Sequence, residues 1–358
     1  MPLTATLPDQ PGEVTPEWLS SVLSGAEDTI RAESVQVIES HSGTTGRTRL
    51  LVEWADTPPL PSEIFVKLPP TDLTSRHMVI TTGMGKREAL FYHELGEEVP
   101  VRIPRPFWSG WNEEGSAYVM LMEDLATSGC RFPSPRDPEL VDHAQSLMRE
   151  LGSLHAFYWN SPRFADDLSW VEPTMRNEWG PKLIESGLEQ FGDEMPDLFC
   201  RLARLYLAQH DAFNDVLDQG PHTLIHGDCH IGNLFVDGQK VGFLDWACFS
   251  HAPGMRDVAY FLCNSLPTRI RQSEQENLLE IYRESLAQSG GPTVSRESIW
   301  EDYRRFAAYS WISAVTTAAA GARMQSLAIG QAAMQRTQAA ITELDTLSLF
   351  ESALGVSS

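Results

Sequence analysis

The chain has 358 residues and a mass of 40.0 kDa, with 27 Lys and Arg residues against 49 Asp and Glu residues. Its formal net charge of −22 argues against nucleic acid and anionic membrane surfaces as partners, because both are polyanions that would be repelled. With 42% hydrophobic and 9% aromatic residues, it can bury the core of one large domain or two medium-sized ones, so disorder is not expected.

The use of cysteine and the hydropathy pattern indicate a cytoplasmic protein. Five cysteines are scattered over positions 130, 200, 229, 248 and 263 without a C-x-x-C pair, unlike a secreted disulfide framework or a structural zinc site. The sequence has no run of 18 consecutive apolar residues, so no membrane span is predicted, and the N-terminal residues do not resemble a secretory signal. We expect no membrane association, and no feature indicates an obligatory protein partner.

The first third of the chain is rich in expected strands. Thr15 followed by Pro16 predicts the start of a helix, with threonine as the cap and proline in the first turn. Residues 34–54 then read as strand, small-residue turn and strand, with the turn over 41–46. Two more strands and a helix are expected in this part, the strands over 64–68 and 117–122 and the helix over 84–96.

After residue 139 the pattern becomes helical. Leu140, Ala144, Leu147, Leu151 and Leu154 follow the 3.6-residue spacing of a helix that packs on a core. Because strands and helices are segregated along the chain, the pattern favours an α+β fold over a parallel βαβ sheet. The other elements expected here are helices over 196–217, 274–288 and 297–345 and short strands over 224–225, 234–236 and 241–244.

The most informative segment is the polar loop at residues 226–233. Four residues separate Asp228 from Asn233, as in the H-x-D-x-x-x-x-N catalytic loop of protein kinases, and Asp245 follows a short apolar strand further on. Phosphoryl transfer needs one carboxylate that faces the acceptor hydroxyl, and an amide and a second carboxylate that hold a divalent metal. The loop and the end of the strand supply all three groups.

Other interpretations of this loop stay open from the residues alone. Asp and Asn are common turn residues, so the three side chains could have only a structural role. His226 and His230 flank Asp228 and could be ligands of a metal-dependent hydrolase. Cys229 lies between them and could be a thiol nucleophile, although no activating partner is visible in the sequence.

Taken with its neighbours, the loop resembles the aminoglycoside phosphotransferase and choline kinase superfamily. The resemblance is carried by His226-Gly-Asp228-x-His230-x-x-Asn233 and by Leu244-Asp245-Trp246, and it extends over roughly residues 15–345. Residues 254–262, Leu151-x-x-Leu154-His155-Ala156 and Phe91-Tyr92 are similar to its ecdysteroid-kinase-like branch, also called CHK kinase-like. It implies a protein-kinase-like bilobal fold, with a small mixed-sheet N-lobe over 1–125 and a large helical C-lobe over 126–358.

The resemblance also implies roles in the C-lobe and in metal binding. Asp228 would be the catalytic base, and Asn233 and Asp245 would be Mg²⁺ ligands. His226 would bond within the catalytic loop, and Asp257 would brace that loop.

In the N-lobe, the resemblance implies a site for ATP. Lys67 would hold the α- and β-phosphates and Glu88 would pair with it. The turn Ser42-Gly43-Thr44-Thr45-Gly46 would cover the phosphates with backbone N–H groups. The hinge Glu123-Asp124-Leu125 would bind the adenine through its backbone.

Two departures from the kinase pattern limit these expectations. The turn has only Gly43 and Gly46 instead of G-x-G-x-x-G, so it could be a plain hairpin turn. Separately, Lys67 and Glu88 could form an ordinary surface ion pair. Trp246 and Ala247 replace the Phe-Gly of D-F-G, and no A-P-E segment is present, so a protein substrate is not expected.

We therefore predict an ATP-dependent small-molecule kinase that transfers the γ-phosphoryl group to the hydroxyl of a small alcohol. An aminoglycoside, choline, ethanolamine or sugar kinase is the alternative within the class, and a catalytically silent pseudokinase is the alternative outside it. A small apolar or cationic acceptor is expected, and the net charge of −22 repels polyanions and mildly favours amines. Four tryptophans could form an aromatic box for a cation, although core positions are the simpler interpretation: Trp159, Trp170, Trp179 and Trp311. Three glutamates could contact an amine, although a solvated surface is the simpler interpretation: Glu172, Glu178 and Glu185.

Overall fold

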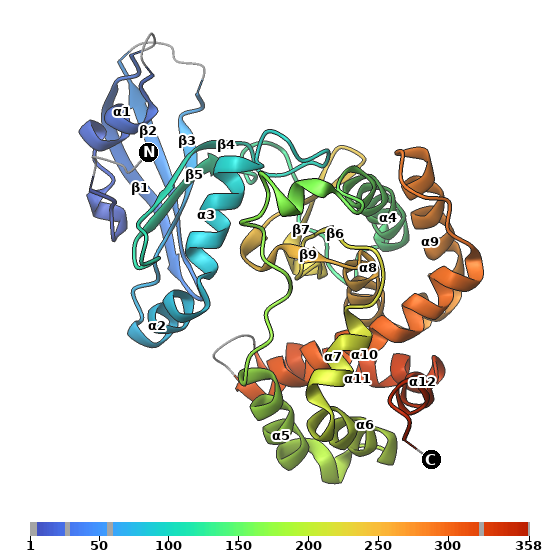
Figure 1. Cartoon of the computed structure of the whole chain (residues 1–358). Helices are drawn as coiled ribbons and strands as arrows, with labels where there is room; N and C mark the ends of the chain where they lie inside the picture. The colour runs from blue at the N-terminus through green and yellow to red at the C-terminus, as the bar shows by residue number, and fades with distance from the viewer. Residues whose placement is uncertain (1–5, 26–28, 56–59, 322–325, 357–358) are drawn as a thin grey trace. The chain divides into compact units, whose positions relative to one another are not determined.

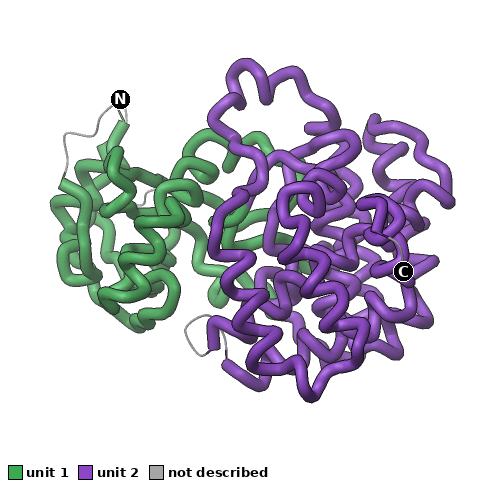
Figure 2. Tube along the Cα trace, turned by 60° about the horizontal axis from the view of Figure 1, so that its bottom comes forward, with its two compact units in different colours: residues 1–132, 235–238, 242–248 green, residues 133–234, 239–241, 249–358 purple. Residues whose placement is uncertain are grey.

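The chain forms two compact units. The structure is a computed structural model that describes residues 6–25, 29–55, 60–321 and 326–356. Figure 2 colours the two units: unit 1 takes residues 1–132, 235–238 and 242–248, and unit 2 takes residues 133–234, 239–241 and 249–358. The assignment of nucleotide binding to 1–125 and acceptor binding to 126–358 stays a prediction about function.

Unit 1 is built on a five-stranded sheet with the order β1-β2-β3-β5-β4, in which neighbouring strands pair antiparallel (Figure 1). The prediction of a mixed sheet is wrong, because all neighbouring strands run antiparallel. Strands β1, β2, β3 and β5 lie where the sequence predicted strands, and β4 is additional. The bounds are β1 Ala32–Ser42, β2 Gly46–Trp54, β3 Glu63–Leu68, β4 Pro106–Trp111 and β5 Tyr118–Glu123.

The two faces of this sheet have different roles. Side chains alternate along a strand, so Ile64, Val66 and Leu68 of β3 point to one face, where they share a core with Leu19 of the first helix. Lys67 points to the opposite face, toward α3. The helices and helical turn of this part are η1 Pro11–Glu13, α1 Pro16–Leu23, α2 Leu73–Thr82 and α3 Met84–Glu94.

Helix α3 packs closely against β5 because Gly85 has no side chain. A Cβ at Gly85 would overlap the ring of Tyr118, so alanine could not be accommodated without a shift of the helix. This close approach fixes the position of Glu88, one turn further along α3.

Unit 2 is mainly helical. Helix α4 packs along α9, and α10 packs against α5 and α11. None of the helices in the described part of the chain is long and apolar enough to cross a membrane. The α-helices are α4 Leu140–Phe157, α5 Trp179–Phe191, α6 Asp197–Ala208, α7 His210–Leu217, α8 Met255–Tyr260, α9 Thr268–Gln288, α10 Arg296–Ala320, α11 Leu327–Glu343 and α12 Thr346–Ala353.

Short strands and tight turns lie in the middle of the chain. Strand β6 pairs with β9, and β7 pairs with β8. The strands are β6 Thr223–Ile225, β7 Leu234–Asp237, β8 Lys240–Phe243 and β9 Ser250–Ala252. The 3₁₀ turns are η2 Pro162–Ala165, η3 Gly192–Glu194, η4 Ile231–Asn233 and η5 Trp246–Cys248, and η6 Phe261–Ser265 is a short π-helix.

Three helical predictions differ from the structure. The stretch 196–217 is two helices, because the backbone leaves the helical conformation at Gln209, and α7 thereby directs Phe213 onto Phe350 with 3.9 Å between ring centroids. The stretch 297–345 contains α10 and α11, and residues 322–325 between them lie outside the described residues. Helix α9 begins six residues before the predicted 274, directly after Pro267.

Candidate active site

The loop between β6 and η4 is held by a buried carboxylate from α8. The backbone N–H of His226 donates to Asp257 Oδ2 at 2.6 Å, and that of Gly227 donates to Asp257 Oδ1 at 2.9 Å. His155 Nε2 of α4 lies 3.5 Å from Asp257 Oδ2. Burial alone would raise the pKa of Asp257, but His155, the charge of His226 and the backbone N–H lower it below its usual value. The carboxylate is therefore charged and anchors the loop.

Asp228 lies in this loop with its carboxylate partly open to solvent. Its side chain is 36% exposed, and Asn233 Nδ2 donates to both the backbone oxygen and Oδ2 of Asp228 at 3.0 Å. The N–H of Asp228 donates to His226 Nδ1 at 3.3 Å, and His230 Nε2 lies 3.6 Å from Asp228 Oδ2. The structure thus brings together Asp228, Asn233, His226 and, through the backbone, Asp257.

In unit 1, one lysine is shared by two carboxylates. Lys67 Nζ donates to Glu88 Oε1 at 2.6 Å and to Asp245 Oδ1 at 3.1 Å. Lys67 and Glu88 are buried, and the side chain of Asp245 is one quarter exposed. Burial alone would lower the pKa of Lys67, but the charges of Asp245 and Glu88 outweigh it and raise the pKa. The interpretation of Lys67 and Glu88 as a surface pair is wrong, because neither reaches the surface.

Asp245 is fixed by the backbone and by the residue after it. Its φ of +66° is in the left-handed region, which costs a non-glycine residue about 1–3 kcal/mol and is tolerated best by Asp and Asn. Trp246 stacks on Phe91 of α3, with 4.2 Å between ring centroids and 10° between planes. Because Glu88 and Phe91 lie three residues apart on α3, they share one face of the helix, which orients Lys67 and Asp245 together.

Glu88 should give the protein a pH-dependent stability that the variant Glu88→Gln lacks. Burial and the charge of Asp245 raise the pKa of Glu88 from its usual 4.5 to about 7. The nearby charge of Lys67 opposes this shift but does not cancel it. Between these values the folded protein holds a proton that the unfolded chain has released, so the free energy of unfolding should fall as pH rises from 4.5 to about 7. Urea unfolding of both proteins across this window measures the difference. Equal pH slopes for the wild type and Glu88→Gln would contradict the prediction.

The glycine turn between β1 and β2 has one tight and one open position. A Cβ at Gly46 would lie 2.9 Å from the carbonyl oxygen of Pro69, so Gly46 is required by the packing of the chain. A Cβ at Gly43 would have nothing within 4 Å, so the fold gives no steric reason for a glycine there. Ser42 Oγ accepts a hydrogen bond from the N–H of Thr71 at 3.2 Å, and Thr45 Oγ1 is buried without a hydrogen-bond partner among the described residues.

In the predicted hinge, two carboxylates are bound by arginines of the protein, and one backbone N–H is left to meet a ligand. The Glu123 carboxylate accepts two hydrogen bonds from Arg102, and the Asp124 carboxylate accepts one from Arg49 Nε at 2.6 Å. The backbone N–H of Leu125 donates to no group among the described residues. A ligand at this segment would therefore meet the backbone of Leu125 and not a free carboxylate.

Several other sequence hypotheses lose support. Burial, together with the charges of Asp257 and Asp228, raises the pKa of the Cys229 thiol well above its usual value, which opposes a nucleophilic role. The described residues contain no cluster of three or more His, Cys, Asp or Glu side chains that could hold a metal, and His226 is buried. Trp311 is fully buried against Phe199, so it is a core residue and not part of a cation box.

One residue that contacts the loop carries no recognisable signal in the sequence. Tyr309 of α10 donates from its hydroxyl to the carbonyl oxygen of Gly227 at 3.0 Å, although the two residues are 82 positions apart. His155, which approaches Asp257, appeared only as part of a segment that resembles a family. Neither contact follows from local spacing, because each depends on how helices of unit 2 pack.

The sequence profile of the phosphotransferase enzyme family, APH, matches residues 41–309, about three quarters of the chain. The chain therefore belongs to this family. It is a phosphotransferase, in the class of small-molecule kinases. A search of curated proteins found no match.

Solved structures show the same fold at low sequence identity. Over 92% of this chain and 97% of the other, a candidate aminoglycoside phosphotransferase from Ralstonia eutropha JMP134 is 15% identical, with a TM-score of 0.52. A choline kinase from Cryptosporidium parvum Iowa II is 12% identical over 89% of this chain and 90% of its own, with a TM-score of 0.52. A candidate fructosamine-3-kinase from Thermobifida fusca YX-ER1 is 16% identical over 92% and 99%, with a TM-score of 0.52. The expected protein-kinase-like fold is confirmed.

Proposed function

We propose that this protein transfers the γ-phosphoryl group of ATP to a hydroxyl of a small alcohol with the help of Mg²⁺. The arrangement of Lys67, Glu88 and Asp245 carries the proposal. Glu88 and Asp245 are 21 and 178 positions away from Lys67 in the sequence, yet both carboxylates contact its ammonium group. Burying a lysine with two carboxylates costs desolvation energy, so stability alone does not explain this arrangement. Binding of phosphate oxygens by the lysine would explain it.

The donors of unit 1 fit a nucleoside triphosphate. Gly43 leaves room for a phosphate close to the backbone, and the buried hydroxyl of Thr45 lacks a partner among the described residues. The N–H of Leu125 is a donor for an adenine ring nitrogen. Lys67 would bind the α- and β-phosphates, with its charge maintained by Glu88 and Asp245.

The oxygen donors proposed for Mg²⁺ are Asn233 and Asp245. Mg²⁺ is usually bound by one or two protein oxygens together with substrate phosphates, so the lack of a larger acidic cluster among the described residues is compatible with this role. Bound at these residues, Mg²⁺ would neutralise the negative charge of the phosphates. In this structure Asp245 accepts a hydrogen bond from Lys67, and Asn233 donates one to Asp228.

Asp228 is the proposed base that accepts the proton of the acceptor hydroxyl. Its carboxylate is exposed enough to meet a substrate. Asn233 Nδ2 orients it with one hydrogen bond to the carboxylate and a second to the backbone oxygen of Asp228. Asp257 supports its position by holding the two preceding N–H groups. His226 adds a third backbone contact within the loop.

The proposed acceptor is a small apolar or cationic alcohol of the kind used by the ecdysteroid-kinase-like branch. The net charge of −22 favours amines over polyanions. An aminoglycoside, choline, ethanolamine or sugar is the alternative acceptor. A silent pseudokinase is the alternative outside the class, and the intact set of Lys67, Asp228, Asn233 and Asp245 opposes it.

A panel of hydroxylated compounds tests this proposal. The protein, ATP and Mg²⁺ are incubated with sterol-like alcohols, choline analogues, sugars and aminoglycosides, and products are identified by a mass increase of one phosphoryl group. We expect a product from a small apolar or cationic alcohol. Turnover of aminoglycosides alone would exclude the proposed branch, and no product from any member, with ATP still bound, would favour the pseudokinase.

The open glycine should be needed for nucleotide binding and not for folding. Gly43→Ala adds a methyl group that meets nothing in the chain, so its thermal stability should equal that of the wild type. If the turn covers phosphates, the methyl group should weaken ATP affinity by roughly tenfold, equivalent to about 1.4 kcal/mol. Calorimetric titration with ATP and Mg²⁺ measures this.

Gly46→Ala is the matched comparison in the same turn. Its new methyl group would clash with the carbonyl of Pro69, so this variant should lose stability. Unchanged ATP affinity in a fully folded Gly43→Ala would show that the turn is a plain hairpin.

A further inference from the structure

The peptide group between Gly227 and Asp228 is held at both of its polar ends. Its carbonyl oxygen accepts a hydrogen bond from the Tyr309 hydroxyl at 3.0 Å, and its N–H donates to His226 Nδ1 at 3.3 Å. Gly227 has a φ of +81°, a conformation that glycine adopts freely, so the backbone here has little intrinsic stiffness. The orientation of this peptide therefore depends on its two partners.

Tyr309 is itself held by side chains from α8. The guanidinium carbon of Arg256 lies 3.8 Å from the centroid of the Tyr309 ring, within cation–π distance. The ring of Tyr260 lies beside it, with 5.6 Å between centroids. Arg256 also precedes Asp257, so one short helix supports the loop directly through Asp257 and indirectly through Tyr309.

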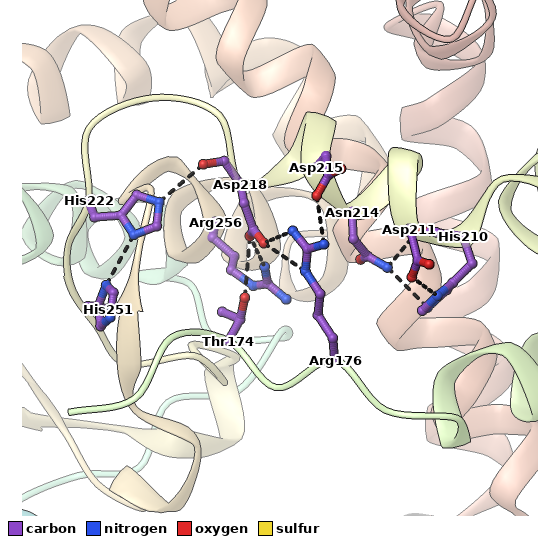
Figure 3. A network of polar contacts seen from close by, with 10 residues as sticks. All are labelled: Thr174, Arg176, His210, Asp211, Asn214, Asp215, Asp218, His222, His251 and Arg256. Carbon is purple, nitrogen blue, oxygen red and sulfur yellow. Dashed lines mark hydrogen bonds and ion pairs between the residues drawn. The ribbon is translucent and has the colours of Figure 1, made fainter. Parts of the chain in front are cut away.

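A carboxylate at the end of α7 connects Arg256 to the segment before α5 (Figure 3). Arg256 Nη1 lies 3.9 Å from Asp218 Oδ1, and Arg176 Nη2 donates to Asp218 Oδ2 at 2.6 Å. Thr174 Oγ1 donates to Asp218 Oδ1 at 3.3 Å. Asp218 is thus within ion-pair distance of Arg256 and links it to Thr174 and Arg176.

We propose that Tyr309 is a positioning residue for Asp228 and that Arg256 keeps Tyr309 in place. The inference rests on the proposed function of Asp228 as the base. Without the Tyr309 hydroxyl, the carbonyl of Gly227 loses its partner and the peptide can rotate about the flexible glycine. Asp228 follows directly, so its carboxylate would leave the orientation that proton acceptance requires.

The variants Tyr309→Phe and Tyr303→Phe test the role of the hydroxyl. Tyr303 is on α10, like Tyr309. Its hydroxyl donates to Gln275 Oε1 at 3.0 Å and accepts from Cys263 Sγ at 3.6 Å, so its variant also loses hydroxyl contacts, but none of them is to the loop. We expect Tyr309→Phe to lower kcat by about tenfold or more with KM for ATP unchanged, because a misplaced base slows transfer and not binding. Tyr303→Phe should keep the wild-type kcat. Equal kcat values for both variants would overturn the proposal.

Hydrogen exchange gives a second readout that needs no acceptor. The amides of the peptide covering 226–233 should exchange faster in Tyr309→Phe than in the wild type or in Tyr303→Phe. Unchanged exchange would overturn the positioning role whatever the turnover. A wild type without turnover on any acceptor, but with faster exchange in Tyr309→Phe, would instead reject the proposed function and keep the role of Tyr309 in the loop.

Arg256→Lys tests the second half of the proposal. Lysine keeps the charge but loses the flat guanidinium that lies on the ring, so kcat should fall, by less than in Tyr309→Phe. In the double variant, Arg256→Lys should add no further loss, because the hydroxyl that it supports is already absent. Independent, multiplicative losses would show that Arg256 does not act through Tyr309.

Discussion

Asp228→Asn should lower the rate of phosphoryl transfer by about 10²- to 10⁴-fold while ATP affinity stays within about twofold. The amide oxygen of asparagine can still accept the hydrogen bond from Asn233, so the loop should keep its shape. What is lost is the carboxylate that accepts the proton of the acceptor hydroxyl. Single-turnover transfer and calorimetric ATP titration measure the two quantities on the same preparation.

The variant Asp211→Asn is the matched control, because it removes a carboxylate of the same unit that is 93% exposed. Its transfer rate should equal that of the wild type. A near wild-type rate in Asp228→Asn would show that Asp228 is not the base, and a parallel loss of ATP binding would place it in nucleotide binding instead.

Asp245→Asn should uncouple nucleotide binding from Mg²⁺. In the wild type we expect ATP to bind more tightly with Mg²⁺ than without, since a carboxylate next to Lys67 would help to hold the metal on the phosphates. Asparagine keeps the positive φ with little strain and retains an oxygen for Lys67, but it has no charge for the metal. Transfer should fall by about 10²-fold or more, because the phosphates are then poorly neutralised.

Asp245→Ala is the comparison that separates strain from charge. Alanine at a φ of +66° should lower the free energy of unfolding by about 1–2 kcal/mol relative to asparagine, measured by urea unfolding. If ATP affinity and its Mg²⁺ dependence both survive in Asp245→Asn, the metal is held elsewhere.

The sequence predicted the parts of the site that depend on short-range spacing. Asp228, His226 and Asn233 lie within one loop, so their fixed separation along the chain already limits how they can be arranged, and the structure brings them together. Lys67 and Asp245 were predicted from the family resemblance together with their place in the pattern, because Lys67 lies within an apolar strand and Asp245 follows one. Their joint contact with Glu88 depends on α3, whose helical pattern is clear in the sequence.

The remaining features depend on packing between distant helices. Tyr309 reaches Gly227 because α10 packs against α8, and the residues around Tyr309 follow the ordinary pattern of a buried helix face. The break at Gln209 has no proline or glycine to mark it, so one helix was predicted where α6 and α7 are formed. Strand β4 was also missed, since Pro106 and Gly110 obscure its alternation.

Transfer of label from γ-³²P-ATP tests the central claim most directly. The purified protein, Mg²⁺ and the accepted alcohol are mixed for a single turnover, and the label is located in the acceptor, in inorganic phosphate or in residual ATP. The proposed mechanism predicts label on the hydroxyl of the acceptor with the wild type, none without Mg²⁺ and almost none with Asp228→Asn. Label that stays in ATP, or that appears only in inorganic phosphate whichever alcohol is offered, would contradict it.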